Sequence, residues 1–373
     1  MMISVQAKWR IWVAFLPVFA LLSASSATAE EPFGEGMEPV AANVRVTPAA
    51  SACDDDCFFY PPRCPLYFQA DAVMFRRDVH GATDAATLNT TDNVVLSTRD
   101  LDMPFSAGPR FLVGHTFGDS PYQVEFSYFW LNDVDEAASV RDNSSNSEGS
   151  QGNLFSPFTG FGATPTVGLD YNNLVSIREY SFMHNMELNL RRQLPMPPGI
   201  LSTSFLIGAR FMGIRERFSY YSESEEPTPT TTNLVRVRAR NELYGFQIGQ
   251  LFEFNVDRMW WVNTELKGAI CNNAAGQETV YTQTIGGATT SFTGTRSKDG
   301  TSFIGDLAVT LVCRPMPHLT TRIGYQAIWV TGAAIAARNF NPDVGILSNG
   351  PAQIDLRGTV VYHGPHAGLE FAW

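Results

Sequence analysis

The sequence predicts an all-β protein folded as one antiparallel transmembrane β-barrel of about ten strands, with eight or twelve as the alternatives. Three observations predict this fold. Segments in which apolar and polar residues alternate recur from Tyr67 to the end of the chain. The links between these segments alternate between short and long, and the last segment ends on the aromatic residue Trp373. Together they form the pattern of a barrel that turns one side of each strand to lipid.

Composition narrows the class of protein and of partner. The chain has 373 residues, of which 12% are aromatic and 17% are charged. No apolar run reaches the roughly 20 residues that a membrane-spanning helix needs, so contact with lipid would have to be made by strands. The formal net charge of −11 argues against nucleic acid as a partner, because binding a phosphate backbone requires a basic surface.

The N-terminal segment, residues 1–29, has the features of an export signal. Lys8 and Arg10 precede a short apolar core at 11–22, and small residues follow it up to Ala27-Thr28-Ala29. We expect cleavage after Ala29, which would place the mature chain beyond the inner membrane. An uncleaved membrane anchor is the alternative reading of these residues.

Residues 30–65 are predicted to be a flexible periplasmic lead-in, because they are rich in Pro, Ala, Glu and Asp and show no periodic pattern. Three cysteines, Cys53, Cys57 and Cys64, lie in this segment. Two of them could form a small disulfide loop in an oxidising compartment, or all could be free thiols. A metal site is disfavoured, because no histidine or second cysteine pair completes a tetrahedral ligand set there.

Residues 66–373 are predicted to form the barrel. The clearest strand is 122–131, where Val124, Phe126 and Tyr128 share one face and Gln123 and Glu125 lie on the other. The apolar face is expected to contact lipid and the polar face to line the lumen. Similar alternation marks the other predicted strands, at 66–76, 110–117, 184–191, 205–216, 241–255, 260–273, 303–313, 321–331 and 367–373.

The lengths of the links distinguish a membrane barrel from a soluble sandwich. Short links follow residues 117 and 194 and occupy 255–258 and 314–317, whereas long polar links occupy 79–104, 133–170, 222–233, 276–301 and 333–358. This sorting predicts short periplasmic turns and long extracellular loops, with both ends of the barrel chain on the periplasmic side. A soluble sandwich with Greek-key connections would not be expected to sort its short and long links in this way.

Two further cysteines, Cys271 and Cys313, are predicted not to form a disulfide. The pattern places them at opposite ends of two adjacent antiparallel strands, Cys271 near an outer loop and Cys313 beside a periplasmic turn. A disulfide requires Cα atoms within about 7 Å.

The polar phase of the strands carries many charged residues that are expected to face the lumen. Carboxylates in pairs could perform acid–base chemistry, but these are spread over many strands and interleaved with Arg and Lys, and nothing in the sequence sets a nucleophile beside a base. We therefore interpret them as the salt-bridged filling of a narrow barrel, and expect no enzyme activity, cofactor or metal. The lumen-facing candidates are Glu125, Glu187, Arg191, Arg210, Glu253, Glu265, Lys267, Asp306 and Arg322.

The final strand is expected to direct assembly. Leu369, Phe371 and Trp373 share one face, and Trp373 is the last residue. A strand that ends on its own aromatic residue resembles the signal read by the bacterial barrel-assembly machinery, which is therefore an expected partner together with outer-membrane lipid. Closure of a barrel also requires the final strand to pair with the first, near residues 67–75.

Ten segments, spread over almost the whole mature chain, carry a family resemblance. They include YFQADAVMFRRD (67–78), GPRFLVGHTFGD (108–119), VEFSYFWLND (124–133), REYSFMHNMELNLRR (178–192), IGARFMGIRERFSYYS (207–222) and the C-terminal YHGPHAGLEFAW. These segments resemble a family of outer-membrane β-barrel proteins found in planctomycete bacteria. The resemblance implies an outer-membrane barrel and supplies no established activity or catalytic residues to transfer.

Three functions are compatible with these patterns. The first is a small porin-like pore for ions or small solutes. The second is a closed structural barrel whose long loops act at the surface, and the third is a barrel enzyme. The mixed charges on the lumen phase favour a plugged lumen slightly, but the sequence alone does not separate the first two functions.

Overall fold

The computed structural model describes residues 65–89, 93–118, 120–142, 152–195, 200–225, 229–257, 259–349 and 354–373, all of which belong to one compact unit, Cys53–Trp373. The predicted export signal (1–29) lies outside the described residues. So does the predicted N-terminal segment up to residue 64, with Cys53, Cys57 and Cys64.

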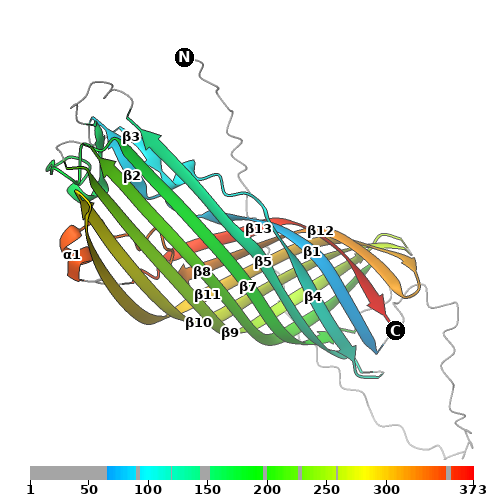
Figure 1. Ribbon diagram of the computed structural model, residues 1–373. Coiled ribbons are helices and arrows are strands. Elements are labelled where there is room, and N and C mark those ends of the chain that lie inside the picture. The colour runs from blue at the N-terminus through cyan, green and yellow to red at the C-terminus, as the bar shows by residue number, and fades with distance from the viewer. Residues whose placement is uncertain are drawn as a thin grey trace, which may run out of the picture. The chain divides into compact units, whose positions relative to one another are not determined.

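Ten antiparallel strands form a closed ring (Figure 1). Because β1 pairs with both β4 and β13, no strand of the ring is left without a second neighbour. The predicted pairing of the final strand with the first is confirmed, for example by Ala70 opposite Leu369. The strands are β1 (Leu66–Val79), β4 (Ser106–Thr116), β5 (Tyr122–Arg141), β7 (Leu174–Gln193), β8 (Leu201–Ser224), β9 (Thr231–Asn255), β10 (Trp260–Ile285), β11 (Ala288–Met316), β12 (Leu319–Ala333) and β13 (Gly358–Ala372).

The pairing register is staggered around the ring. Paired residues can be followed around the ring, starting from Tyr67 on β1 and its partner Gly114 on β4. After each strand has been visited once, the path returns to β1 at Val79, the partner of Val360 on β13. Such a stagger accompanies strands tilted by about 35–45° to the barrel axis. It also brings side chains that are distant in the sequence to the same height inside the barrel.

The two ends of the barrel differ. At one end, here called the turn end, short links join β4 to β5, β7 to β8, β9 to β10 and β11 to β12, as the sequence predicted. The opposite end, the loop end, carries the longer connections together with one short link, between β10 and β11. The longer connections include a separate three-stranded sheet of β2 (Asp84–Leu88), β3 (Val94–Ser97) and β6 (Leu154–Phe155), two 3-10 turns at Thr98–Asp100 and Pro157–Thr159, and the helix α1 (Val344–Asn349).

The prediction of a long polar loop at 276–301 is wrong. Strand β10 continues to Ile285 and β11 begins at Ala288, so only Gly286 and Gly287 lie between them. Both glycines have positive φ, 57° and 88°, as a tight hairpin turn requires. The segment lacks apolar alternation because both of its faces are rich in Thr and Ser, but β-branched threonine still suits a strand.

Other predicted loops are also partly regular structure. Strand β5 extends to Arg141, and the link between β12 and β13 contains α1, a helix that the sequence patterns did not reveal. Cys271 consequently lies in the middle of β10 and not near a loop, which corrects its predicted position. Cys271 and Cys313 are both free, as predicted, with Cys271 opposite Ser302 and Cys313 opposite Trp260. Among the described residues, no helix is long and apolar enough to cross a bilayer.

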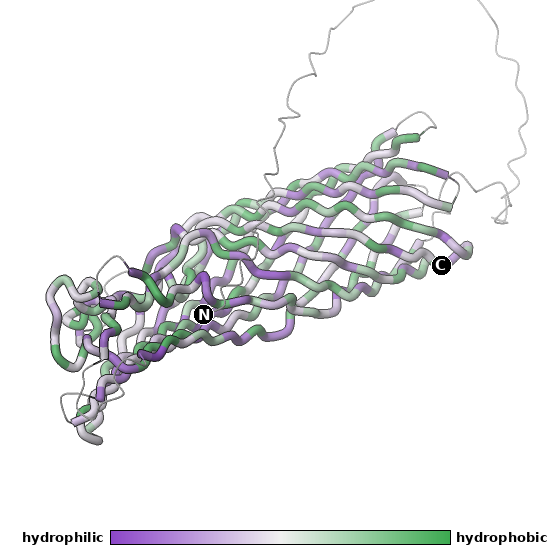
Figure 2. Tube along the Cα trace, turned by 90° about the horizontal axis from the view of Figure 1, so that it is seen from above, coloured by the Kyte–Doolittle hydropathy of each residue, from purple (hydrophilic) through white to green (hydrophobic). Residues whose placement is uncertain are grey.

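Hydropathy alternates along the barrel strands, as Figure 2 shows. In the half of the barrel nearer the turn end, the outward positions are apolar and exposed. Phe126, Leu188, Phe246, Ile248 and Ile323 are between 43% and 60% exposed, although each is a large hydrophobic residue. We call this continuous outward surface the apolar belt.

Candidate functional site

The interior of the barrel is the candidate functional site, and at the turn end it holds a cavity of about 720 Å³. Pro121, Leu194 and Pro317 line its mouth, and Lys267 and Gln326 lie at its inner end. The cavity wall carries both signs of charge, because inward positions of some strands supply arginine or lysine, such as Arg191 and Lys267, and others supply glutamate, such as Glu125 and Glu370. A solute entering from the turn end would meet this mixed wall.

Arg191 organises the charges of the cavity. Its Nε and Nη2 donate to the two carboxylate oxygens of Glu125 at 2.9 and 3.0 Å, and Nη2 also donates to Glu265 at 2.8 Å. Tyr67 donates its hydroxyl to Glu125 at 2.7 Å. On the other side of the cavity, Arg322 donates to Glu370 at 3.0 Å. These bidentate and shared bonds connect side chains of neighbouring strands and, across the lumen, of strands that are not neighbours.

A second network closes the inner end of the cavity. Arg210 donates to Asp306 at 3.2 Å and to Asn185 at 2.8 Å, and its side chain is fully buried. Lys267 lies 3.1 Å from Glu187 and 3.5 Å from Asp306. We call Glu187, Arg210, Lys267 and Asp306 the central network. Buried charges of this kind are tolerated only when each is paired and hydrogen-bonded, as here.

Above the central network, apolar side chains from the strands meet inside the barrel. Met183, Met212, Leu243 and Ile328 are at most 1% exposed, and Tyr362 is 2% exposed. Phe75 and Phe129 pack edge to face with ring centroids 6.1 Å apart. We call this cluster the apolar layer. Side chains from eight or more strands contribute to it, so it fills the cross-section between the central network and the loop end.

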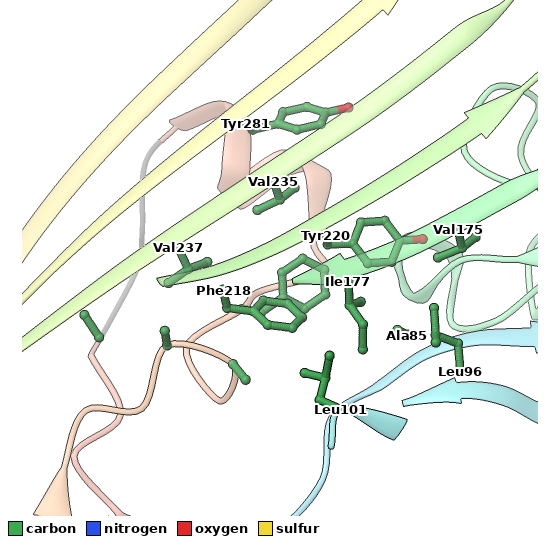
Figure 3. Packing of buried hydrophobic residues seen from close by; sticks show 14 of the residues in the cluster. Ala85, Leu96, Leu101, Val175, Ile177, Phe218, Tyr220, Val235, Val237 and Tyr281 are labelled. Atoms are coloured by element: carbon green, nitrogen blue, oxygen red, sulfur yellow. The ribbon is translucent and has the colours of Figure 1, made fainter. Parts of the chain in front are cut away.

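At the loop end, segments outside the ring fold over the interior. Figure 3 shows Phe218, Tyr220, Val235 and Val237 gathered against residues that come from the loop-end connections. Phe340, from the link between β12 and β13, lies at 5.6 Å from Phe218 and 5.4 Å from Tyr220 between ring centroids. The cluster, here called the cap, also includes Ala86, Leu96, Leu101, Ala334, Ala336, Leu347 and Ile354.

Polar bonds fasten the cap to the barrel. Arg77 on β1 contacts Glu216 at 2.5 Å and Glu179 at 3.0 Å, and Glu216 accepts the backbone N–H of Ala336 at 2.9 Å. Asn241 accepts the N–H of Ala334 at 2.7 Å and donates to its carbonyl at 2.8 Å. The link between β12 and β13 is therefore held by side chains of β8 and β9 as well as by apolar packing.

At the outer edge of the cap, Asp355 bonds two arginines. Partial burial alone would raise the pKa of the Asp355 carboxyl, but hydrogen bonds from Arg357 hold that pKa below its usual value, and Arg338 lies 3.4 Å away. Asp355 therefore stays ionised and joins the end of the link between β12 and β13 to Arg338 near the start of the same link.

The structure places all nine lumen-facing candidates on the inner side of the ring. Glu187, Arg210, Lys267 and Asp306 come together in the central network, and Glu125, Arg191 and Glu265 in the network around the cavity. Glu253 lines the cavity and accepts a bond from Ser202 at 2.7 Å, and Arg322 pairs with Glu370.

Two functional contacts escaped sequence reasoning. Arg77 lies one residue beyond the predicted strand 66–76, and Glu179 lies five residues before the predicted strand 184–191; continuing the period-two alternation that far would have placed both inward. The amides Asn185 and Gln247 lie on the inward phase of the predicted strands 184–191 and 241–255, but their bonds to Arg210 and Glu187 depend on side chains from other strands.

The interior does not assemble a hydrolytic centre from the described residues. Thr310 Oγ1 lies 3.1 Å from His366 Nε2, which is the arrangement of a hydroxyl beside a base. However, His366 Nδ1 has no hydrogen-bond partner within the described part of the chain, so no carboxylate orients the ring. In the same described residues, no group of three or more His, Cys, Asp or Glu could hold a metal ion.

Replacing an outward belt residue by arginine is expected to disrupt insertion far more than the same change on the inner face. Phe126→Arg would place a charge in the apolar belt at a cost of about 2–4 kcal/mol if the belt contacts lipid. Ser127→Arg is the matched control, because the adjacent side chain points into the cavity. The measurement is the yield of folded protein in lipid vesicles, and equal yields for the two variants would contradict the assignment of faces. Gln247 is not a suitable control, because it is fully buried and bonded to Glu187 and Asn189.

Residues of the predicted assembly signal lie outward at the turn end. Leu369, Phe371 and Trp373 are 43%, 45% and 55% exposed. The backbone of Trp373 bonds that of Leu66 in both directions, at 3.0 and 3.3 Å, where the ring closes. The indole itself projects away from the barrel.

Comparison with known proteins identifies a family. The family model described as "Putative beta barrel porin-7 (BBP7)" matches residues 73–364, which is most of the barrel. No curated protein matches the chain.

Solved structures with similar strand arrangements include the outer membrane protease OmpT from Escherichia coli, with 8% identity, coverage of 84% of this chain and 98% of that one, and a TM-score of 0.43. The P. putida toluene transporter TodX has 7% identity, coverage of 85% and 92%, and a TM-score of 0.24. A Pseudomonas aeruginosa FadL homologue has 9% identity, coverage of 84% and 90%, and a TM-score of 0.23. Likeness at this level assigns neither an activity nor a substrate.

Proposed function

Because this chain belongs to the putative beta barrel porin-7 family, we propose that it is an integral outer-membrane β-barrel, and that its closed lumen makes it a structural, surface-presenting protein and not an open pore. Different features of the barrel support its location in the outer membrane, the closure of its lumen and the presentation of its loop end outside the cell.

Location is supported by the outward surface. The apolar belt surrounds the half of the ring nearer the turn end, and large residues such as Leu188 and Phe246 are more than half exposed there. A soluble monomer rarely exposes so much contiguous apolar surface. In this proposal the export signal is cleaved after Ala29, the turn end faces the periplasm and the loop end lies outside the cell.

The filling of the lumen is the single observation that carries the proposal of a closed barrel. The cavity ends at the central network, where Arg210 and Asp306 are at most 2% exposed. The apolar layer follows, and the cap covers it. A permeating ion would have to separate buried ion pairs and then cross an apolar layer, and each of these steps is costly.

Presentation is supported by the unequal lengths of the strands. Strands β8 to β11 continue beyond the level at which β12 and β13 end, so that β11 pairs with β12 only as far as Phe303 opposite Thr331. The hairpin of β10 and β11 extends from there to Gly286 and Gly287 (Figure 1). Its polar faces suit water, so this sheet would project outside the membrane.

A porin-like pore is the second candidate, because the description of the family favours it. It would require the cap and the apolar layer to move aside. An enzyme is less well supported, since the Thr310–His366 pair lacks an orienting group in the described residues.

Purified protein refolded into planar bilayers is expected to insert without stepwise conductance. Insertion is checked by heat-modifiable mobility on gels, and an established porin in the same bilayer serves as the positive control. A variant in which a two-residue turn replaces the link between Ala333 and Gly358 should also be silent, because the apolar layer and the central network lie below the cap. Stable conductance of the unaltered protein would contradict closure, and conductance of the shortened variant alone would identify the cap as a gate.

A further inference from the structure

The outward surface of the barrel becomes strongly basic where the apolar belt ends. On β8, the outward positions run from Phe205, Ile207 and Phe211 to Arg215 and Arg217. On β9, the outward positions in the same direction run from Ile248, Phe246 and Tyr244 through Glu242 to Arg240, Arg238 and Arg236. With Arg178 on β7, six arginines form one surface, which we call the arginine wall (Arg178, Arg215, Arg217, Arg236, Arg238 and Arg240).

The register sets these arginines against one another. Arg215 is directly opposite Arg240, and Arg217 is directly opposite Arg238, on the same outward face of β8 and β9. Like charges placed directly across a strand pair are destabilising. Two such pairs follow one another, so the repulsion between the arginines has to be offset by neighbouring negative charge.

Carboxylates of the described residues neutralise only part of the wall. Asp135 accepts two bonds from Arg178 at 2.6 Å, Glu278 pairs with Arg238 at 2.8 Å, and Glu242 pairs with Arg240. Arg215, Arg217 and Arg236 form no ion pair with a carboxylate in the described part of the chain. Arg217 instead lies over the ring of Tyr180, 5.3 Å from its centroid.

The wall also has a concave site. A pocket of about 400 Å³ on the outward face is lined by four of the arginines, by Ser176 and Ser219, by Tyr180 and Tyr221, and by Leu234 and the carboxylate Asp135, which is paired with Arg178. Guanidinium groups bind phosphate oxygens in a planar, two-pronged geometry, and the hydroxyls of Ser176 and Ser219 can donate further hydrogen bonds. The pocket thus combines the donors that a phosphate group requires.

We propose that the arginine wall binds the phosphate-bearing headgroup of an anionic lipid in the outer leaflet. This inference rests on the proposed function, which orients the loop end outward. The wall follows the aromatic residues Phe211 and Tyr244 on the same face, and aromatic side chains mark the membrane interface in barrels. Phosphates of a lipid whose chains lie against the apolar belt would therefore sit at the level of the arginines. This location favours a lipid over a soluble polyanion.

Native mass spectrometry of the detergent-refolded, full-length mature protein tests the proposal. The probes are diphosphorylated lipid A and the same lipid after enzymatic removal of its phosphates, so that only the headgroup charge differs. We expect the protein to retain the phosphorylated lipid at least about tenfold better than the dephosphorylated one. The variant R217Q/R236Q/R238Q should lose this preference. The control variant R76Q/R99Q/R357Q removes the same charge outside the wall and should keep it.

Several results would overturn the lipid site. They are equal retention of the two lipids, undiminished retention by the wall variant, or equally tight binding of soluble polyglutamate or polygalacturonate to the same arginines. Heat-modifiable mobility of every variant shows that the barrel has formed. Failure of the unaltered protein to insert into micelles or vesicles contradicts the proposed function and this inference with it, whereas insertion without a phosphate preference contradicts the lipid site alone.

Discussion

Replacing Arg210 by methionine is expected to lower the free energy of unfolding by about 3–5 kcal/mol, because the change leaves buried charge without its partner. Asp306, which is 1% exposed, would lose its bond from Arg210 at 3.2 Å and keep only the more distant Lys267 and one amide. Asn185 would also lose its donor. Methionine preserves most of the volume, so the loss reports charge pairing more than packing.

Denaturant unfolding of the refolded protein in detergent measures this loss. Arg238→Met is the control, since it breaks a strand-to-strand ion pair with Glu278 at 2.8 Å whose two side chains are 47% and 35% exposed. Exposed pairs of this kind contribute about 0–1 kcal/mol. A similar small loss for both variants would show that the central network does not hold the lumen together.

A double variant separates the free energy of the interaction between Arg210 and Asp306 from the contribution that each side chain makes by itself. In Arg210→Met with Asp306→Met, neither charge is left alone, so the combined loss should be smaller than the sum of the two single losses by about 0.5–3 kcal/mol. Additive losses would mean that Arg210 and Asp306 act independently, despite their contact. The outcome also bears on closure, because the network that resists unfolding is the one that would have to separate for ions to pass.

The faces of the strands could be predicted from the sequence, whereas the partners inside the lumen could not. Strict alternation assigns Arg210 and Asp306 to the inner face, but these residues are 96 positions apart and lie on β8 and β11, which are not neighbours. Their contact follows from the stagger of the register around the whole ring. No local pattern encodes that stagger, since it results from ten strand pairings acting together.

The predictions from sequence failed for the parts of the fold that lie beyond the apolar belt. Alternation was recognised by an apolar face, and the outer part of the hairpin of β10 and β11 has no continuous one, because Thr, Ser and Gln are frequent on both of its faces, although the inward Tyr281 is buried in the cap. The cap was missed for a related reason. Phe340 and Leu347 belong to a link rich in Ala, Asn and Gly, and their burial depends on a pocket formed by Phe218 and Tyr220 on another strand. The arginines of the arginine wall can be read in the sequence, but their place on the outward face follows only once β8 and β9 are known to extend past the apolar belt.

Trp373→Ala is expected to stop assembly of the barrel in cells while leaving export and signal cleavage intact. The indole is 55% exposed and projects away from the barrel, so its loss should cost little stability once the barrel has formed. The backbone bonds of residue 373 to Leu66, which close the ring, are retained in the alanine variant. We therefore attribute the expected defect to recognition by the barrel-assembly machinery. Deleting Trp373 or replacing it by Asp should have the same effect in cells.

Two measurements separate recognition from packing. Membrane fractions of cells that produce Trp373→Ala should lack the heat-modifiable species, and the cleaved chain should be degraded in the periplasm. The same variant, purified and refolded in detergent micelles without any assembly machinery, should form the barrel as well as the unaltered protein. Phe254→Ala removes another outward aromatic residue at the turn end, 41% exposed, and should assemble normally in cells. If Trp373→Ala fails equally in cells and in micelles, the indole stabilises the closed ring itself. If it succeeds in both, the terminal aromatic residue is not an assembly signal in this protein, and recognition must depend on the rest of β13, including Leu369 and Phe371.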